Sequence, residues 1–423
     1  MVAAVLFLSF IGLLVFGVPI AIALGVAALA AMVTDGLPMM LLPMQMYSNI
    51  ARFLLLAIPF FILAGNIMTK SGISGRLINL VEKCAGHYKG GLAIVAVLAA
   101  LFFSAMSGSG PATVAALGVV LIPAMMARGY GDTMPAALLA SSGALGIITP
   151  PSIALVVFGS ISGTSISDLF IGGIVPGVLM AIVLMGASLI IFRKLDIPVL
   201  PKASAKERWI AFKDAIWGIM MPVIILGGIY GGFFTPTEAA AVAAVYGLFV
   251  GIFIYRCIKI KEFIEIMISS AKGTAVVMLI VACASLFAWF AQTSGISAQI
   301  SNLLITVSGG NLIVFLLMVN IILLVIGTVI DANSAMFIFV PIMLPVAVYL
   351  GYNPVAFGLL MVVNLAIGLF TPPAGVNLFV ACGISGNNLM QISRAVLPFI
   401  VASLIALLLI TFLPQFTTLL FIR

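Results

Sequence analysis

One stretch of the sequence, residues 107–151, is repeated further along the chain at a fixed offset of 222 positions. The alignment of the two copies needs no gap. Among the residues that recur unchanged are seven that carry the pattern: Pro123, Gly129, Tyr130, Gly146, Thr149, Pro150 and Pro151 match Pro345, Gly351, Tyr352, Gly368, Thr371, Pro372 and Pro373. Chance does not produce seven identities in an ungapped stretch of this length. The sequence therefore predicts an internal duplication, which constrains the fold more than any single motif does.

The composition is that of a membrane protein. Of the 423 residues, 64% are hydrophobic and 7% are charged, and the mean hydropathy is +1.38, whereas soluble domains carry roughly 25% charged residues. Because a membrane-crossing helix needs about 20 apolar residues, we expect an all-α polytopic membrane protein. Apolar spans are predicted at 4–32, 51–69, 132–163, 167–193, 211–231, 237–258, 273–291, 354–386 and 391–413.

Two further apolar stretches, 92–127 and 312–350, are each interrupted by a polar cluster near the middle. The first cluster is Ser107-Gly-Ser109-Gly-Pro111 and the second is Asp331-Ala-Asn333-Ser334. Glycine is flexible and proline lacks a backbone N–H, so a helix is expected to stop at the first cluster. Non-helical backbone persists at membrane depth only inside protein or beside water. We therefore interpret both stretches as re-entrant helical hairpins whose tips offer oxygen ligands.

The charged loops predict the orientation of the chain. Sixteen of the eighteen basic residues fall on one side of the predicted spans, and only Arg52 and Arg423 fall on the other. By the positive-inside rule, the first side is cytoplasmic. This places the N-terminus inside and the C-terminus outside. The net charge of +7 belongs to these loops and gives no indication of nucleic-acid binding.

The same scheme predicts that the two copies enter the membrane from opposite faces. The loop before the first hairpin, 70–90, is basic, whereas its counterpart, 292–310, has no charged residue. Repeat one would cover about 51–193 and repeat two about 273–413. Basic loops and two linking spans would fill 194–272. Inverted repeats of this kind are a recurrent architecture of secondary transporters.

A Thr-Pro-Pro sequence breaks the next helix of each copy. Pro150 and Pro372 remove backbone N–H donors, as do the prolines that follow them, Pro151 and Pro373. Carbonyl groups are thereby freed over Gly146–Thr149 in the first broken helix, 132–163, and over Gly368–Thr371 in the second, 354–386. Two hairpin tips and two broken helices would together present four sets of oxygen ligands near the middle of the membrane.

Hydroxyls, amides, carbonyls and one carboxylate suit a hard cation, for which we favour Na+, while the N-termini of half-helices suit an anion. A cation beside an anion makes a coupled symport site. The candidate Na+ ligands are Ser107, Ser109, Gly146, Thr149, Asp331, Asn333, Gly368 and Thr371. The candidate substrate contacts are Thr113, Ser142, Ser152, Ser334, Asn364 and Asn377.

Each candidate also has a structural alternative. Ser107 and Ser109 could pack helices together, and Asp331 could act only as a helix cap, although ionisable residues at membrane depth are functional by default. The proline pairs could be simple kinks. The buried Asn and Ser side chains could hydrogen-bond between helices. Thr235-Pro-Thr-Glu238 has the pattern of a capping box with proline at the first helical position.

The chain resembles the large membrane subunit of the tripartite ATP-independent periplasmic (TRAP) transporters over nearly its whole length, beginning with Gly12-Leu-Leu-Val-Phe-Gly-Val-Pro19. The most specific elements are Ile58-Pro-Phe-Phe-Ile-Leu-Ala-Gly65, Ser107-Gly-Ser109, Thr149-Pro-Pro-Ser152, Phe234-Thr-Pro-Thr-Glu-Ala239 and Gly368-Leu-Phe-Thr-Pro-Pro-Ala374.

The resemblance implies an elevator-type transporter of the bacterial inner membrane that imports organic acids with a Na+ gradient and needs no other cofactor. Sugar acids such as sialic acid, C4-dicarboxylates and keto acids are all open as substrates. It also implies two partners, a small four-helix membrane subunit on a separate chain and a periplasmic substrate-binding protein. One Na+ site would use Ser107 and Ser109 with the Thr149 break, and the other Asp331 and Asn333 with the Thr371 break.

Two alternative functions compete with this one, a stand-alone carrier and an intramembrane enzyme. A stand-alone dicarboxylate or citrate carrier, coupled to Na+ or H+, would share the fold but need no binding protein. An intramembrane enzyme is disfavoured, because the sole histidine, His87, lies in a predicted loop and no His-Glu-x-x-His zinc motif occurs.

Overall fold

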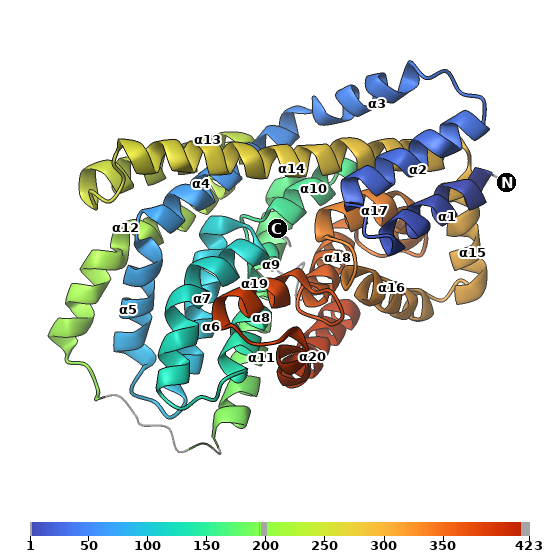
Figure 1. The fold of residues 1–423 in the computed structure, drawn as a ribbon. Coiled ribbons are helices and arrows are strands. Elements are labelled where there is room, and N and C mark those ends of the chain that lie inside the picture. The colour runs from blue at the N-terminus through green and yellow to red at the C-terminus, as the bar shows by residue number, and fades with distance from the viewer. Residues whose placement is uncertain (1, 194, 196–200, 416–423) are drawn as a thin grey trace.

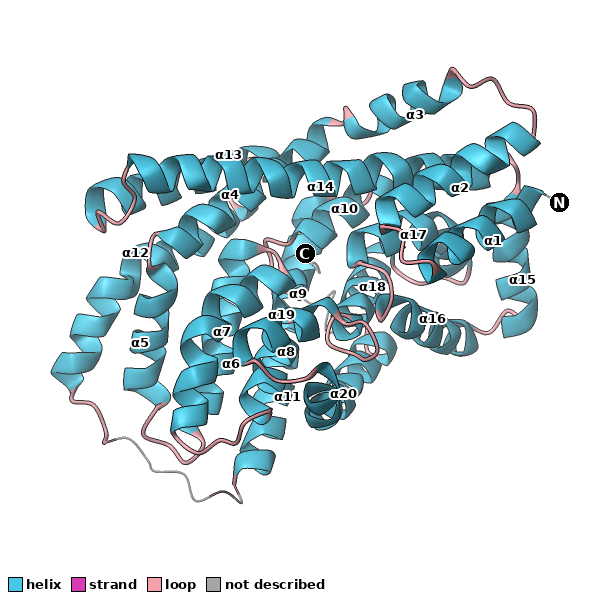
Figure 2. Ribbon diagram, in the orientation of Figure 1, coloured by secondary structure: helices cyan, strands magenta, loops and turns pink. Residues whose placement is uncertain are grey.

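The computed structural model describes residues 2–193, 195 and 201–415, and every regular element in these ranges is a helix (Figure 2). By length and composition, eight helices could cross a bilayer, and the bent pair Met134–Ile148 and Ile153–Ser162 would add a ninth. The all-α membrane class is confirmed. Of the basic residues that set the predicted orientation, Lys194 and Arg423 lie outside the described residues.

The N-terminal region differs from its prediction as a single span over 4–32. It forms two helices, α1 (Val2–Val15) and α2 (Ile20–Thr34), which pack against each other. Gly17 adopts φ +77° and Pro19 precedes α2, so the chain turns although every residue nearby is apolar. The prediction of a cytoplasmic N-terminus assumed that residues 4–32 cross the membrane once. Two helices in this region remove the basis for that prediction.

The segments expected to be loops at 70–90, 256–272 and 292–310 are largely helical, and so is 41–50. Their charged residues and most of their polar ones are exposed or half-buried on the outer faces of amphipathic helices, which a hydropathy reading treats as loop. The corrected elements are α3 (Leu41–Ile50), α5 (Ile73–Ala85), α14 (Ile260–Thr293) and α15 (Ile296–Ser308).

Helices α4, α13, α14 and α2 lie side by side as a bar along one edge of the molecule (Figure 1). We call this bar, with α3, the arm. Here α4 (Ala57–Lys70) follows a 3-10 turn, η1 (Phe53–Leu56), and α13 (Pro236–Phe249) continues into a π-helical turn, η2 (Val250–Ile254). Helix α12 (Ala205–Tyr230) packs against α5 and α13. The predicted capping box at α13 is confirmed: Thr235 N donates to Glu238 Oε2 at 2.8 Å, and Glu238 N donates to Thr235 Oγ1 at 3.3 Å.

Both interrupted stretches are helix–break–helix units. In the first copy they are followed by the broken helix and a long final helix: α6 (Gly91–Ser107), α7 (Gly110–Ala127), α8 (Met134–Ser142), α9 (Leu145–Ile148), α10 (Ile153–Ser162) and α11 (Ile166–Phe192). In the second copy the elements are α16 (Leu312–Gly327), α17 (Ala332–Tyr349), α18 (Pro354–Gly368), α19 (Val376–Ser385) and α20 (Leu389–Phe412).

Element bounds repeat at the offset seen in the sequence. Adding 222 to the bounds of α7, 110 and 127, gives 332 and 349, which are the bounds of α17. The same addition brings α10 to within one residue of α19. The equivalent Tyr130 and Tyr352 are both buried and hydrogen-bonded, to the N–H of Leu92 and to the carbonyl of Thr411. Burial raises the pKa of the Tyr130 phenol above its usual value.

Each copy packs helices against the other copy. Helix α7 of the first copy packs against α19 of the second, and the equivalent α17 packs against α10 of the first. Helices α11 and α20, which are themselves equivalent, also pack together. This reciprocal pattern is that of a two-fold relation between the copies, and it gathers both hairpins and both broken helices at the centre of the molecule (Figure 1).

Replacing Gly368 with alanine is expected to destabilise the centre of the second copy. A Cβ there would lie 2.5 Å from the carbonyl carbon of Gly327, which is backbone and cannot swing aside. Overpacking of this kind costs about 1–3 kcal/mol, so thermal unfolding in detergent should begin several degrees lower for G368A. G383A in α19 is the control, because its Cβ meets nothing within 4 Å. Equal midpoints for the two variants would contradict the close approach.

Candidate functional site

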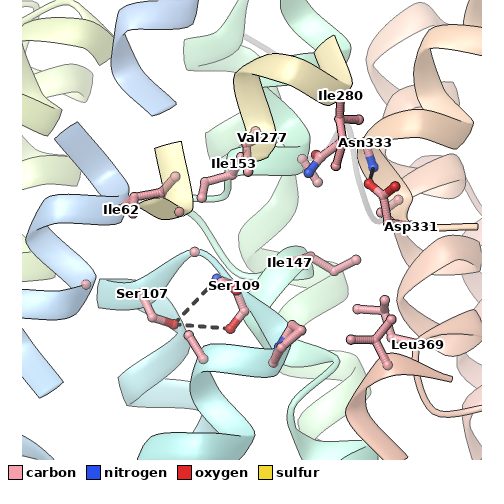
Figure 3. Close-up of a pocket in the computed structure, with 18 of the residues that line it drawn as sticks. Ile62, Ser107, Ser109, Ile147, Ile153, Val277, Ile280, Asp331, Asn333 and Leu369 are labelled. Atoms are coloured by element: carbon pink, nitrogen blue, oxygen red, sulfur yellow. Dashed lines mark hydrogen bonds between the residues drawn. The ribbon is translucent and has the colours of Figure 1, made fainter. Parts of the chain in front are cut away.

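A cavity of about 330 Å³ lies between the two hairpin tips. Ser107, Ser109 and Pro111 line it from the first tip, and Asp331 and Asn333 line it from the second. Figure 3 shows the two groups on opposite sides of the space. The structure thus brings together five residues that the sequence singled out from segments more than 200 positions apart.

The remaining walls come from the broken helices and from the arm. The lining residues of the broken helices are Ile147, Ile153, Ala154, Leu369 and Val376, and those of the arm are Ile62, Gly65, Asn66, Gly273, Val277 and Ile280. The arm wall is therefore apolar except for one amide. Asp331 is the one charged side chain among the described residues that line the cavity.

Four helices begin at this cavity. Its lining includes first-turn residues of α7 (Ala112), α10 (Ala154), α17 (Asn333) and α19 (Val376). The first N–H groups of a helix have no partner within the helix and carry partial positive charge. Four helix N-termini directed at one space make it favourable for an anion although no lysine or arginine lines it among the described residues.

The four N-termini are not equally free. At α17 the Asp331 carboxylate accepts from the N–H groups of Asn333 and Ser334, at 3.0 and 3.1 Å, and also from the Ser334 hydroxyl. At α10, Ser152 Oγ accepts from the N–H of Leu155. Neither α7 nor α19 has a side-chain cap. The uncapped N-termini are therefore those of α7 and α19.

The first tip is held by a small group of hydroxyls. Thr113 Oγ1 donates to the Ser109 carbonyl at 2.9 Å and lies 3.0 Å from Ser107 Oγ. The N–H of Ile153 reaches the Gly108 carbonyl at 3.4 Å, which joins this tip to the start of α10. Thr113, a predicted substrate contact, is hydrogen-bonded to the two serines that line the cavity.

Two glycines allow the broken helices to approach the hairpins closely. A Cβ on Gly146 would lie 2.4 Å from the Ser109 carbonyl oxygen, and one on Gly368 would meet Gly327. At Gly146 the backbone of α9 therefore lies against the Ser109 carbonyl of the first tip. This contact fits the cation ligands expected there, although neither glycine lines the cavity itself.

The two threonines of the proline breaks do not face the cavity. Thr149 Oγ1 is buried without a hydrogen-bond partner among the described residues, and it lies against Gly177 of α11. Thr371 Oγ1 donates to the Ile367 carbonyl at 2.7 Å. The breaks themselves are present as expected, with cis peptide bonds at Pro150–Pro151 and Pro372–Pro373.

The other expected substrate contacts lie behind the cavity wall rather than in it. Ser152 donates to the Ile147 carbonyl at 2.6 Å, and Ser334 donates to Asp331. Asn377 donates to the Ala140 carbonyl at 3.0 Å, and its Oδ1 is buried without a partner among the described residues. These side chains fix the ends of the interrupted helices.

Asn364 belongs to a buried polar chain that links three helices of the second copy. Its Nδ2 donates to Asn320 Oδ1 at 2.7 Å, and Asn320 Nδ2 donates to Thr411 Oγ1 at 3.0 Å. In the first copy, subtracting 222 places Leu98 and Leu189 opposite Asn320 and Thr411. Only Ser142, opposite Asn364, is polar there, and its hydroxyl is unpartnered within the described part of the chain. The second hairpin is therefore tied to its neighbours more firmly than the first.

Asn66 is a cavity residue that the sequence reasoning missed. It lies on α4, and its Nδ2 donates to Ser270 Oγ of α14 at 2.9 Å. Within the apolar span 51–69 it is the sole amide side chain. A polar residue in the middle of such a span is the signal that could have identified it.

The fold has a counterpart among solved structures. The YdaH transporter of Alcanivorax borkumensis superposes with a TM-score of 0.64 over 89% of this chain and 87% of that one, at 15% sequence identity. At this identity the likeness shows the fold alone. Within the described residues, eight or nine helices able to cross a bilayer, with interrupted helices around a central cavity, define a polytopic membrane protein.

The family follows from the sequence matches. The family described as "Tripartite ATP-independent periplasmic transporter, DctM component" matches residues 7–416. The C4-dicarboxylate TRAP transporter large permease protein of Pseudomonas aeruginosa is 43% identical over 88% of this chain and 87% of its own length. The sialic acid TRAP transporter large permease protein of Vibrio cholerae is 39% identical over 97% and 96%. The chain belongs to the DctM family of TRAP transporter large permease proteins. It is thus a multi-pass inner-membrane transporter subunit and not an enzyme.

Replacing Thr113 with valine is expected to loosen the first tip. The change keeps the shape of the side chain but removes the hydroxyl that holds Ser107 and the Ser109 carbonyl, and one such hydrogen bond contributes about 1 kcal/mol. Amide hydrogen exchange in a peptide covering the tip should accelerate about fivefold in T113V. T306V, which removes an exposed hydroxyl in α15, should leave that peptide unchanged. An unchanged tip in both variants would refute the supporting role.

Proposed function

We propose that this chain imports an organic acid by Na+ symport as the membrane-embedded path of a tripartite transporter. The observation that carries the proposal is the cavity between the hairpin tips, where helix N-termini and the Asp331 carboxylate lie around one space. Positive helix ends favour an anion, whereas a carboxylate beside freed carbonyls favours a cation. Sites that hold both ligands side by side are the basis of coupled transport.

The anionic head of the substrate binds at the first tip and at the start of α19. The N-termini of α7 and α19 are uncapped, so their N–H groups are available to a carboxylate. Ser107 and Ser109 lie beside α7 and can add hydroxyl donors. The α17 end is already capped by Asp331, whose negative charge repels a second anion.

Sodium ions bind where interrupted helices end in free carbonyls. One position uses Asp331 and Asn333. The side-chain Oδ1 of Asn333 has no partner among the described residues. The other uses Ser107, Ser109 and the end of α9 beside Gly146. Because the first tip is neutral and the second carries Asp331, the two positions differ in affinity. Cations at these positions would offset the charge of the bound acid between them.

The loaded hairpins and broken helices move past the arm. The arm presents mostly apolar side chains to the cavity, and the amide of Asn66 bonds to Ser270, which is also on the arm. Sliding along this wall breaks few hydrogen bonds. An unloaded unit would carry unsatisfied backbone groups into an apolar barrier, which is costly. One contact that must break is Arg52 Nη1 to the Ser160 carbonyl at 2.9 Å, at the end of α10.

Family membership supports the remaining parts of the proposal. The relatives are named for a C4-dicarboxylate and for sialic acid, both of which carry carboxylates. We infer an organic acid for this chain, together with a small membrane subunit and a periplasmic binding protein. The same membership favours this tripartite arrangement over a stand-alone carrier.

Uptake into proteoliposomes tests the whole proposal. The chain would be reconstituted with its small subunit, and labelled C4-dicarboxylates, sugar acids and keto acids would be offered with and without a Na+ gradient and a binding protein. We expect uptake only when both the gradient and the binding protein are present. Uptake without the binding protein would establish a stand-alone carrier. Uptake driven by protons alone would remove Na+ from the mechanism.

Replacing Asp331 with asparagine isolates the second cation position. Asparagine caps helices as well as aspartate does, so α17 should persist. Opposite unit charges 4 Å apart attract by about 4 kcal/mol at an effective dielectric constant of 20. Losing one third of this attraction already weakens Na+ binding about tenfold. The half-saturating Na+ concentration for uptake should therefore rise at least tenfold in D331N.

Asp132 provides the matched control, because it is exposed in the loop before α8 and its carboxylate forms no hydrogen bond or ion pair with another described residue. D132N should keep the sodium dependence of the parent protein. A D331N protein with the same half-saturating concentration as D132N would exclude Asp331 as a sodium ligand.

A further inference from the structure

A groove of about 400 Å³ lies between α5 and the first two turns of α12. Its lining consists of Leu80 and Cys84 from α5 and Ala205, Arg208, Trp209 and Phe212 from α12. The groove thus combines one cationic side chain with an apolar floor. The central site uses none of these residues.

The Arg208 guanidinium has no hydrogen-bond acceptor in the described part of the chain. Its Nε and Nη2 are shielded from solvent and nonetheless donate to nothing there. A shielded donor without a partner raises the free energy of the folded protein. An acceptor supplied from outside would gain these hydrogen bonds without breaking any, and the planar guanidinium matches the geometry of a phosphate.

The nearest acid does not compete for Arg208. The Glu207 carboxylate caps the start of α12 by accepting from the N–H of Ser204 at 2.7 Å, and it pairs with Lys83 of α5 at 3.5 Å. Lys206 and Lys213 flank the groove on the same helix, and Lys213 Nζ lies 5.5 Å from the centre of the Trp209 ring. The charge around Arg208 is therefore positive and uncompensated.

The apolar part of the groove suits a hydrocarbon chain. Trp209 is 57% exposed and stacks on Phe212 with their ring centres 5.6 Å apart. These rings lie at the start of a helix whose remaining length is apolar enough to cross a bilayer. Exposed tryptophan at the end of such a helix, beside basic residues, is typical of the level of lipid headgroups.

We propose that this groove binds one anionic phospholipid, with its phosphate on Arg208 and an acyl chain along Leu80, Trp209 and Phe212. A soluble anion would use the arginine but would leave the aromatic floor uncovered, so the lining favours a lipid. The site would join α5 to α12 from outside the protein. It does not depend on what the central cavity transports.

Tryptophan quenching by brominated lipids tests the proposal. Replacing Trp217 and Trp289 with phenylalanine leaves Trp209 as the single tryptophan of the chain, which has three. This protein, with its small subunit, would be placed in phosphatidylcholine bilayers that contain brominated phosphatidylglycerol or brominated phosphatidylcholine. We expect the anionic lipid to occupy the site with about fivefold preference, which corresponds to about 1 kcal/mol per basic residue near an anionic lipid.

Two variants distinguish a site from a general attraction. R208Q should abolish the preference, whereas K206Q, which removes one exposed charge from the same helix, should keep it. R208K keeps the positive charge but lacks the planar guanidinium, so it should retain less than half of the preference. This variant tests the same contact if R208Q does not fold. Equal quenching by both lipids in the parent protein would overturn the proposal, and so would equal losses in R208Q and K206Q. Loss of the preference in millimolar inorganic phosphate would assign the groove to a soluble anion instead.

Discussion

The structure depends on one constraint, which is that backbone groups freed by a helix break must find partners inside the protein. In a membrane no solvent is available to satisfy them. The chain meets this constraint by bringing its interruptions together: the breaks after Ser107, Ile148, Gly327 and Gly368 all lie at the centre, around one cavity. Because helix N-termini and C-termini end there together, the site offers both donors and acceptors. The same concentration of unsatisfied groups is costly in the empty protein and would make the binding of the proposed ligands favourable.

The two hairpins share a plan but differ in how they meet this constraint. The second tip supplies its own anion, Asp331, which occupies the start of α17, whereas the first tip leaves α7 uncapped and holds Ser107 with Thr113. The second hairpin is further fixed by the chain of Asn320, Asn364 and Thr411, which has no equivalent in the first. The two hairpins are thus similar in plan, but the second carries the charge of Asp331 and the first is neutral.

Much of this arrangement could be predicted from the sequence. The breaks at Ser107 and Asp331 followed from residue types that end helices, and the fixed offset identified the equivalent segments. The turn between α1 and α2 escaped because Gly17 and Pro19 lie within an apolar run. Which way Thr149 points could not be predicted, because side-chain direction at a break depends on the packing of α11 rather than on local sequence. The failures therefore concern both element bounds within apolar or amphipathic stretches and the direction of side chains, whereas the successes concern the positions of the breaks.

The packing of helices from one copy against the other also governs how the chain can be assembled during synthesis. Helix α7 ends at residue 127 and its partner α19 ends at residue 385, so 385 − 127 = 258 further residues must leave the ribosome before α7 is covered. At about 5–20 residues per second this takes roughly 13–50 s. During that interval the first hairpin has been made but lacks the neighbour that buries its face. Its breaks must be sheltered by α6, α8 and surrounding lipid or insertion machinery, so the final fold of the first half is completed only when the second half arrives.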